Sequence, residues 1–361
     1  MDSFNIAALR GLQAGREYYV AMCPMHYLKQ FIFDGSELPP ELRHQRVLNK
    51  SRVPGITQYL LDNPKDYVFS SLFACIDSKV KFEPLGNKGE EFRIGMLTIP
   101  MSAKIVINDG QHRKAAIEEA LIQRPDFRDE TISVVFFIDE GLTRSQQIFA
   151  DLNRHAVRPT KSLGILFDHR DQFSQLARKI ADEISFFNGL TEMEKTSISN
   201  RSIKLFTLSS IYQSTKILLK KGAKDKISSN DESLAIQFWE EVGKHIPDWQ
   251  WAAQKKVRPA ELREEYVHAH GVALQALGIL GAELVSKYPN NWKAKLKKLS
   301  KVDWSRKNVK FWEGRALING RLSKSNNSVL LSVNGLKTVL NLPLTKEQKE
   351  LEKEYSSNGK K

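Results

Sequence analysis

The stretch INDGQHRKAAIEEAL, residues Ile107–Leu121, joins a strand-like run to a helix-like run through the five residues DGQHR. The β-branched residues before Asn108 predict a strand, and the alanine and leucine positions after Arg113 recur at helical spacing. A strand-to-helix turn presents the first backbone N–H groups of the helix, which favour a bound anion. The stretch therefore predicts an α/β arrangement with a candidate anion site at its turn.

Two interpretations of this turn remain open. In the first, Gly110 allows a close approach of the backbone, and Gln111, His112 and Arg113 donate hydrogen bonds to a phosphate. In the second, Asp109 is an ordinary N-cap and Arg113 forms a surface ion pair. The first interpretation places all five residues in an anion or nucleotide site, with a nucleoside triphosphate as the candidate ligand.

A second polar stretch, FADLNRHAVRPTKS at residues 149–162, follows the predicted strand at 131–139. Its Asn153 and Arg154 are candidates for the same anion site if the segment returns beside the DGQHR turn. The alternative is a structural loop without a ligand. Asp109 and Asp151 could share a metal in principle, but no carboxylate or histidine spacing supports this, so we predict no metal site.

Length and periodicity predict two domains. The chain has 361 residues, of which 41% are hydrophobic, enough for two ordinary cores. Strand patterns dominate up to about residue 160, and helical patterns dominate beyond it, including one continuous run at 260–287. We therefore expect an α+β protein with a mixed α/β domain at 1–160, a mainly helical basic domain at 161–345, and a charged tail at 346–361 in which a short helix frays into disorder.

Several classes of protein are disfavoured by the composition. No apolar run reaches the roughly 18 residues that a membrane-spanning helix needs, and the first residues lack the layout of a signal peptide. Cys23 and Cys75 lie far apart with no neighbouring zinc-ligand pattern. Cys23 is expected to be a small buried residue rather than a reactive thiol. We expect a cytoplasmic protein without a membrane partner.

The net charge of +13 is concentrated in one region. Residues 287–324 contain 12 basic and 2 acidic residues, interleaved with Trp292, Trp304, Phe311 and Trp312. Lysine and arginine neutralise phosphates and aromatic rings can stack on bases, so nucleic acid is the expected ligand. The alternative is a solvated basic surface whose tryptophans pack into the core. The candidate DNA contacts are Arg43, Arg46, Arg52, Lys293, Lys297, Lys298, Arg306, Lys307 and Lys310.

The motifs INDGQHRKAAI and FADLNRHAVRPTKSL resemble the DGQHR family, and most of the chain is most similar to its DndB branch, accessory proteins of bacterial DNA phosphorothioation. The segments QRVLNKSRVPGI and ISNRSIKLFTLSSI add to this resemblance. More remotely, the turn is similar to the G-x-x-R-x-x-A pattern of the ParB and sulfiredoxin superfamily, which implies a related N-terminal fold. Sulfiredoxin carries a cysteine within its turn, where this chain has Gln111, so thiol catalysis is not expected.

The resemblance implies a DNA-binding negative regulator that acts on the promoter of its own modification gene cluster. Its expected partners are that DNA and the phosphorothioation enzymes. Because many bacterial operators have two-fold symmetry, we expect a homodimer. Two alternatives remain: an enzyme that hydrolyses nucleotides or nicks DNA through the DGQHR turn, and a scaffold without chemistry of its own.

Overall fold

The computed structural model describes residues 3–32, 48–138, 146–148, 150–152, 159–199, 201–222 and 225–358. It divides into two compact units, Met1–Val157 and Arg158–Lys361. Each unit has its own cluster of buried hydrophobic side chains. The first unit contains the large sheet and the second is mainly helical, which confirms the α+β class.

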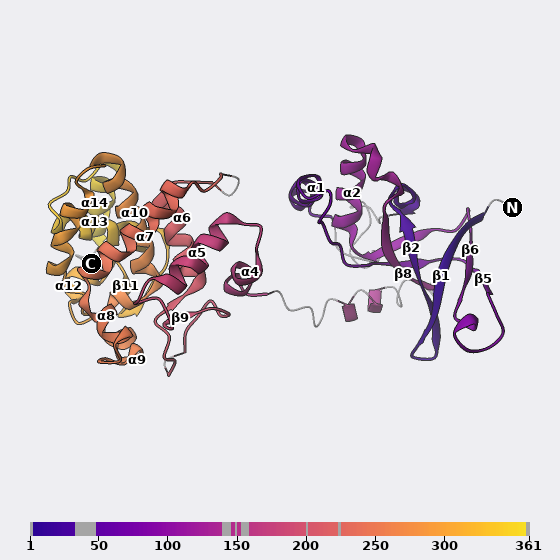
Figure 1. Cartoon of the computed structure of the whole chain (residues 1–361), viewed down its shortest axis with the longest axis horizontal. Coiled ribbons are helices and arrows are strands. Elements are labelled where there is room, and N and C mark those ends of the chain that lie inside the picture. The colour runs from indigo at the N-terminus through magenta and orange to yellow at the C-terminus, as the bar shows by residue number, and fades with distance from the viewer. Residues whose placement is uncertain are drawn as a thin grey trace. The chain divides into compact units, whose positions relative to one another are not determined.

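An eight-stranded mixed sheet forms the first unit, with the strand order β3-β7-β4-β8-β2-β1-β6-β5 (Figure 1). Two neighbouring pairs, β3 with β7 and β4 with β8, are parallel, and the other pairs are antiparallel. The strands are β1 (Ser3–Gln13), β2 (Arg16–Pro24), β3 (Phe31–Ile32), β4 (Leu72–Ile76), β5 (Lys81–Pro84), β6 (Ile94–Pro100), β7 (Ile105–Asp109) and β8 (Thr131–Ile138).

One face of this sheet is the core face. Alternate residues of β8, namely Ile132, Val134 and Phe136, are buried, whereas the residues between them are partly exposed. Helices α1 (Val53–Asp62) and α2 (Gln111–Gln123) pack against each other beside the sheet (Figure 1). Ile117 and Ala120 of α2 belong to the same buried cluster as the sheet residues. The DGQHR helix is therefore part of the core of this unit.

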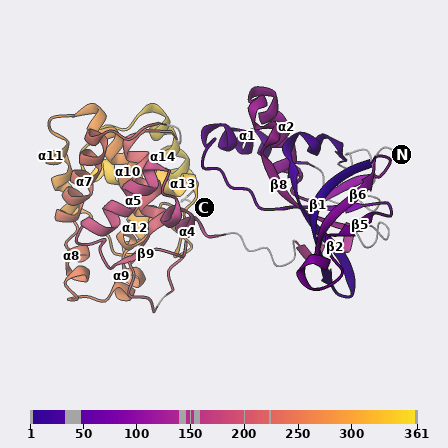
Figure 2. The ribbon, with the colours of Figure 1, turned by 45° about the vertical axis from the view of Figure 1, so that its right-hand side comes forward.

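The second unit gathers its helices around α10, most of whose residues are buried (Figure 2). Two short pairs of strands complete it: β9 (Thr191–Glu192) with β10 (Phe206–Thr207), and β11 (Leu317–Ile318) with β12 (Arg321–Leu322). The helices are α4 (Lys161–Phe167), α5 (Gln172–Glu183), α6 (Leu208–Leu219), α7 (Ser229–Lys244), α8 (Pro247–Ala253), α9 (Pro259–Glu265), α10 (Gly271–Lys287), α11 (Trp292–Leu296), α12 (Val309–Trp312), α13 (Asn326–Val339) and α14 (Lys346–Asn358).

The continuous helix expected at 260–287 is interrupted. Between α9 and α10 lies a single 3-10 turn, Val267–Ala269, and the N–H of Val267 donates to the carbonyl of Trp304. The break turns His268 into the core, where its Nδ1 accepts from Trp249 Nε1 at 3.1 Å and its Nε2 lies 3.1 Å from Asp248 Oδ2. Local periodicity does not reveal such a break, because tertiary partners of His268 cause it.

The charged tail is ordered at residues 346–358, where it forms α14, so the expectation of disorder is wrong for these residues. Arg315 makes a bidentate pair with Glu352, at 2.6 and 2.8 Å, and the Tyr355 hydroxyl donates to the carbonyl of Glu313 at 2.6 Å. The composition of the tail favours disorder, but the partners that order it lie on other elements of the unit. The local sequence does not show those contacts.

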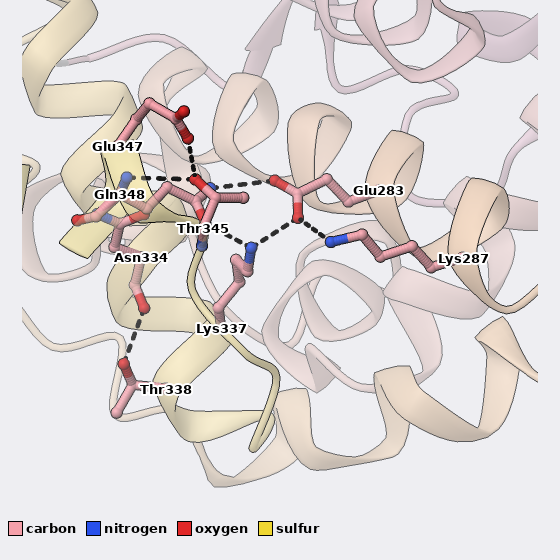
Figure 3. Close-up of polar contacts among 8 residues, drawn as sticks. All are labelled: Glu283, Lys287, Asn334, Lys337, Thr338, Thr345, Glu347 and Gln348. Atoms are coloured by element: carbon pink, nitrogen blue, oxygen red, sulfur yellow. Dashed lines mark hydrogen bonds and ion pairs between the residues drawn. The ribbon is translucent and has the colours of Figure 1, made fainter.

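A buried lysine joins α14 to the rest of the unit (Figure 3). Lys337 of α13 is only 1% exposed, and its ammonium donates to Glu283 Oε2 of α10 and to Gln348 Oε1 of α14, both at 2.6 Å. Gln348 Nε2 also donates to Glu283 Oε1 at 3.1 Å. These bonds compensate for the cost of burying the charge, and they fix three helices to one another.

Candidate functional site

Gly110 forms the DGQHR turn and is itself the N-cap of α2. Its φ of 101° lies in the left-handed region, and a Cβ at this position would collide with Leu72. The N-cap residue makes no side-chain cap hydrogen bond. Asp109 is the last residue of β7 rather than the N-cap, so the capping interpretation of its carboxylate is wrong.

Arg113 uses its guanidinium within the first unit. Nη2 donates to Asp109 Oδ2 at 2.8 Å, while Nη1 donates to the carbonyls of Ser70 and Ser71 at 2.6 and 2.9 Å and to the Ser70 hydroxyl. Burial lowers the pKa of Arg113, and the charge of Asp109 opposes this shift. The side chain therefore ties the start of α2 to the segment that enters β4.

The two residues between Gly110 and Arg113 are buried. Gln111 is 5% exposed and His112 is 7% exposed. His112 Nε2 accepts a hydrogen bond from the backbone N–H of Asn49 at 3.1 Å. Gln111 Oε1 has no hydrogen-bond partner among the described residues. The structure thus joins the DGQHR turn to the segment Asn49–Arg52, two stretches that are about 60 positions apart in the sequence.

The second polar stretch meets the sheet elsewhere. Asp151 and Leu152 line a cavity with the β1–β2 turn and with Ile138, at the end of β8. In the sheet, Ile138 lies opposite Ile76 at the end of β4. Asn153 and Arg154, which were predicted to share the anion site, lie outside the described residues.

Asp109 lies at the other edge of the same strands. It is paired with Phe73, near the beginning of β4, and Phe73 in turn is paired with Val135, in the middle of β8. The two carboxylates have different partners: Asp109 Oδ2 accepts from Arg113, and Asp151 Oδ1 accepts from Gln147 Nε2 at 2.7 Å. Within the described part of the chain, no group of three or more His, Cys, Asp or Glu side chains could hold a metal ion.

The aromatic residues of the basic region are structural. Trp292 and Trp304 are each 6% exposed, and Trp312 is fully buried, with Nε1 donating to the carbonyl of Asp303 at 2.8 Å. The indole rings of Trp304 and Trp312 stack at 5.3 Å. The prediction that these tryptophans stack on nucleic-acid bases is wrong, because the hydrophobic core of the second unit uses them.

The lysines of the basic region differ in exposure and in their polar partners. Lys297, Lys307 and Lys310 are exposed, and the nearest carboxylate to Lys307 is Glu265 at 3.9 Å. Lys298 is half-buried, and exposed Lys293 donates to Gln237 Oε1 at 2.7 Å.

Arg306 differs from these lysines because the fold uses its guanidinium. It donates to the carbonyls of Glu264 and Gly320, both at 3.0 Å. Of the candidate DNA contacts in the first unit, Arg52 is exposed, and Arg43 and Arg46 lie outside the described residues. Among the described candidates, Arg52 and most of the lysines are thus exposed cations, whereas the fold uses Arg306.

Both cysteines are buried and free. Burial raises the pKa of the Cys23 thiol to about 12, which agrees with a packing role rather than a reactive one. Among the helices in the described ranges, none has the length and apolar character needed to cross a membrane.

Comparison with curated proteins and with solved structures gave no match. The suggested relationship to ParB and sulfiredoxin therefore remains a prediction. Comparison with protein families gave a match to DndB, described as DNA-sulfur modification-associated, over residues 6–343. Because this match covers nearly the whole chain, including the sheet unit and most of the helical unit, the protein belongs to the DndB family of DNA-sulfur modification-associated proteins.

Proposed function

We propose that this protein is a DNA-binding negative regulator of the gene cluster whose enzymes place sulfur in the DNA backbone. The observation that carries the proposal is the separation of side chains at residues 292–312. Tryptophans are buried there, while Lys297, Lys307 and Lys310 are exposed, and among these three, within the described part of the chain, only Lys307 has a carboxylate within 4 Å, that of Glu265 at 3.9 Å. Membership of a DNA-sulfur modification family makes DNA the natural polyanion.

Such a surface binds DNA mainly through its phosphates. Each lysine that neutralises a phosphate releases counterions, so affinity falls steeply with salt and depends little on sequence. Recognition of one promoter then needs further contacts or two half-sites. We therefore propose that two copies of the chain bind one operator, and that the modification enzymes are additional partners.

A gel-shift titration of the full chain tests the proposal. The probes are the promoter fragment of the modification cluster and a scrambled duplex of equal length, each at three salt concentrations. A regulator binds the promoter more tightly at every salt concentration, and light scattering of the complex gives two chains per duplex. Equal affinity for both probes would contradict operator recognition, and no binding to either would contradict the DNA proposal itself.

Repression is tested separately with a reporter gene behind the same promoter. Expression of the protein should lower the reporter signal, and a variant with Lys297, Lys307 and Lys310 changed to alanine should restore it. A reporter that does not respond, despite selective promoter binding, would separate DNA binding from regulation.

A further inference from the structure

The helical unit contains a polar cavity of about 350 Å³ that the basic surface does not explain. It lies where the first residues of α6 and α10 meet α9 and the segment after β12. Its polar lining includes Thr207, Ser210, Arg263, His270, Arg306 and Lys324. Its volume is at the small end of the range for ligand pockets, which is suitable for a ligand of about nucleotide size.

Positive charge dominates this cavity. Three lining residues carry a permanent positive charge, and one, Glu264, is a carboxylate. The N-termini of α6 and α10, helices of 12 and 17 residues, add partial positive charge. His270 is neutral near pH 7, because burial and the neighbouring cations lower its pKa to about 4.

The two arginines shape the walls of the cavity. Arg263 donates to the carbonyls of Ser199 and Ser202, at 2.9 and 3.0 Å, and to the carbonyl of Lys204. Arg306 donates to the carbonyls of Glu264 and Gly320. Their N–H groups donate to carbonyls of the surrounding loops and so fix these loops, while their positive charges remain at the cavity wall. Both arginines therefore raise the electrostatic potential in the cavity without being proposed as ligand contacts.

Lys324 is the cation that remains for a ligand. Its ammonium lies against the start of α10, where a Cβ added to Gly271 would be 3.0 Å from Lys324 Nζ and 2.6 Å from Ser210 Oγ. No ion pair involves Lys324 among the described residues. Although the residue as a whole is exposed, desolvation lowers the pKa of this ammonium. A cation beside a helix N-terminus is electrostatically unfavourable, and an anion between the two would compensate it.

We propose that this cavity binds the phosphate group of a nucleotide-sized ligand, with Lys324, Ser210 and the N-terminus of α10 as its contacts. Apolar side chains in the same lining, Ile198, Phe206 and Leu322, offer a surface for a base or sugar. The phosphate can come from a free nucleotide or from a DNA strand, since both present the same group. The proposal does not depend on promoter regulation.

Isothermal titration calorimetry on the full chain tests the proposal with three probes: inorganic phosphate, a deoxynucleoside 5′-monophosphate and a short single-stranded oligonucleotide. The variants are Lys324→Ala and Gly271→Ala, whose methyl group would crowd both Ser210 Oγ and the lysine ammonium and should therefore also weaken binding. The matched control is Arg321→Ala, an exposed cation on β12 that does not line the cavity. Circular dichroism confirms that each variant is folded.

Loss of one charged hydrogen bond predicts an affinity lower by roughly 10- to 150-fold in Lys324→Ala, with Arg321→Ala unchanged. If the monophosphate shows this loss, the ligand is a free nucleotide. If only the oligonucleotide shows it, the phosphate belongs to DNA. The proposal is overturned if no probe binds the parent protein, or if both alanine variants at the two cations lose affinity equally.

Discussion

Arg113 in the first unit and Lys324 in the second are both cations beside the start of a helix, and the protein uses them in opposite ways. Arg113 donates to Asp109 and to the carbonyls of Ser70 and Ser71, so its donors have protein acceptors. Lys324 is in no ion pair within the described part of the chain and lines a cavity. The more conspicuous motif in the sequence is therefore the one that the fold uses most completely.

This difference shows that the residue types in a motif do not determine whether it can reach a ligand. A guanidinium has five N–H donors in a fixed plane, which suit several carbonyls of one loop as well as they suit a phosphate. A lysine at the end of a flexible stem has no such fixed geometry. The decisive property is which acceptors the tertiary structure supplies, and this can be tested in each unit separately.

The largest expected effect is on Lys337, the buried cation of the second unit. Lys337→Ala leaves Glu283 without its main partner, so we expect the free energy of unfolding of this unit to fall by about 3 kcal/mol. All six tryptophans lie in this unit, so urea unfolding followed by tryptophan fluorescence reports it alone. The control is Lys287→Ala, which removes a cation 3.9 Å from the same carboxylate and should cost less than about 0.5 kcal/mol. If both variants lost the same free energy of unfolding, burial of Lys337 would not explain its contribution to stability.

Arg113→Ala should be the next largest, with a loss of about 2–3 kcal/mol in the first unit, because several charged hydrogen bonds disappear. Cys23 and Cys75 are both buried in that unit, so their labelling by a thiol-reactive dye reports its opening. Arg113→Lys keeps the charge without the planar fork and should be intermediate. Unchanged labelling in Arg113→Ala, together with weaker phosphate binding, would restore the anion-site interpretation of the turn.

The pH dependence of stability should be confined to acid conditions in the second unit. The folded-state pKa of His270, about 4, lies below the usual 6.5, so the unfolded chain binds more protons between these values. The free energy of unfolding should therefore be fully present above pH 6.5 and fall by about 2 kcal/mol as the pH drops to about 5. Fluorescence-detected urea unfolding at several pH values measures it. His270→Gln should remove most of this slope. The part that remains belongs to His268, whose pKa burial also lowers, and to carboxylates such as Glu241, whose pKa Lys244 and His245 lower against the effect of burial. A slope unaffected by the substitution would assign the effect to other groups.

Much of the fold follows from local sequence patterns. The strand at 131–138 alternates clearly, and the strand and helix on either side of Gly110 have the expected types. The β1–β2 hairpin is harder to predict, because its turn places Ala14 at a φ of 51°, a conformation that alanine rarely adopts. The interruption before α10 depends on partners of His268 that are distant in the sequence.

The candidate site was less predictable than the fold. Periodicity could not show that the tryptophans interleaved with lysines face the core. The helices of this region, α11 and α12, have only five and four residues, which is too short for a clear repeat of buried and exposed positions. The cavity near Lys324 brings together residues from six stretches between positions 196 and 324. The only hint in the sequence was the family-like segment ISNRSIKLFTLSSI, whose Phe206, Thr207 and Ser210 line that cavity.

The smallest effects on stability are expected for the exposed lysines, and they would sharpen the comparison most. Lys297→Ala, Lys307→Ala and Lys310→Ala should each change the free energy of unfolding by less than about 0.5 kcal/mol, because their side chains are exposed.

On DNA, each lost phosphate contact should reduce the slope of log affinity against log salt by about one, for promoter and scrambled duplexes alike. Arg306→Ala is the contrasting variant: its bonds to Glu264 and Gly320 predict a loss of stability that the lysine variants do not share. Fluorescence anisotropy at several salt concentrations measures the slopes. If the triple lysine variant is folded and keeps the parent slope, these lysines do not contact DNA. Exposure of a cation in the second unit would then be no better evidence for a ligand contact than the DGQHR motif around Arg113.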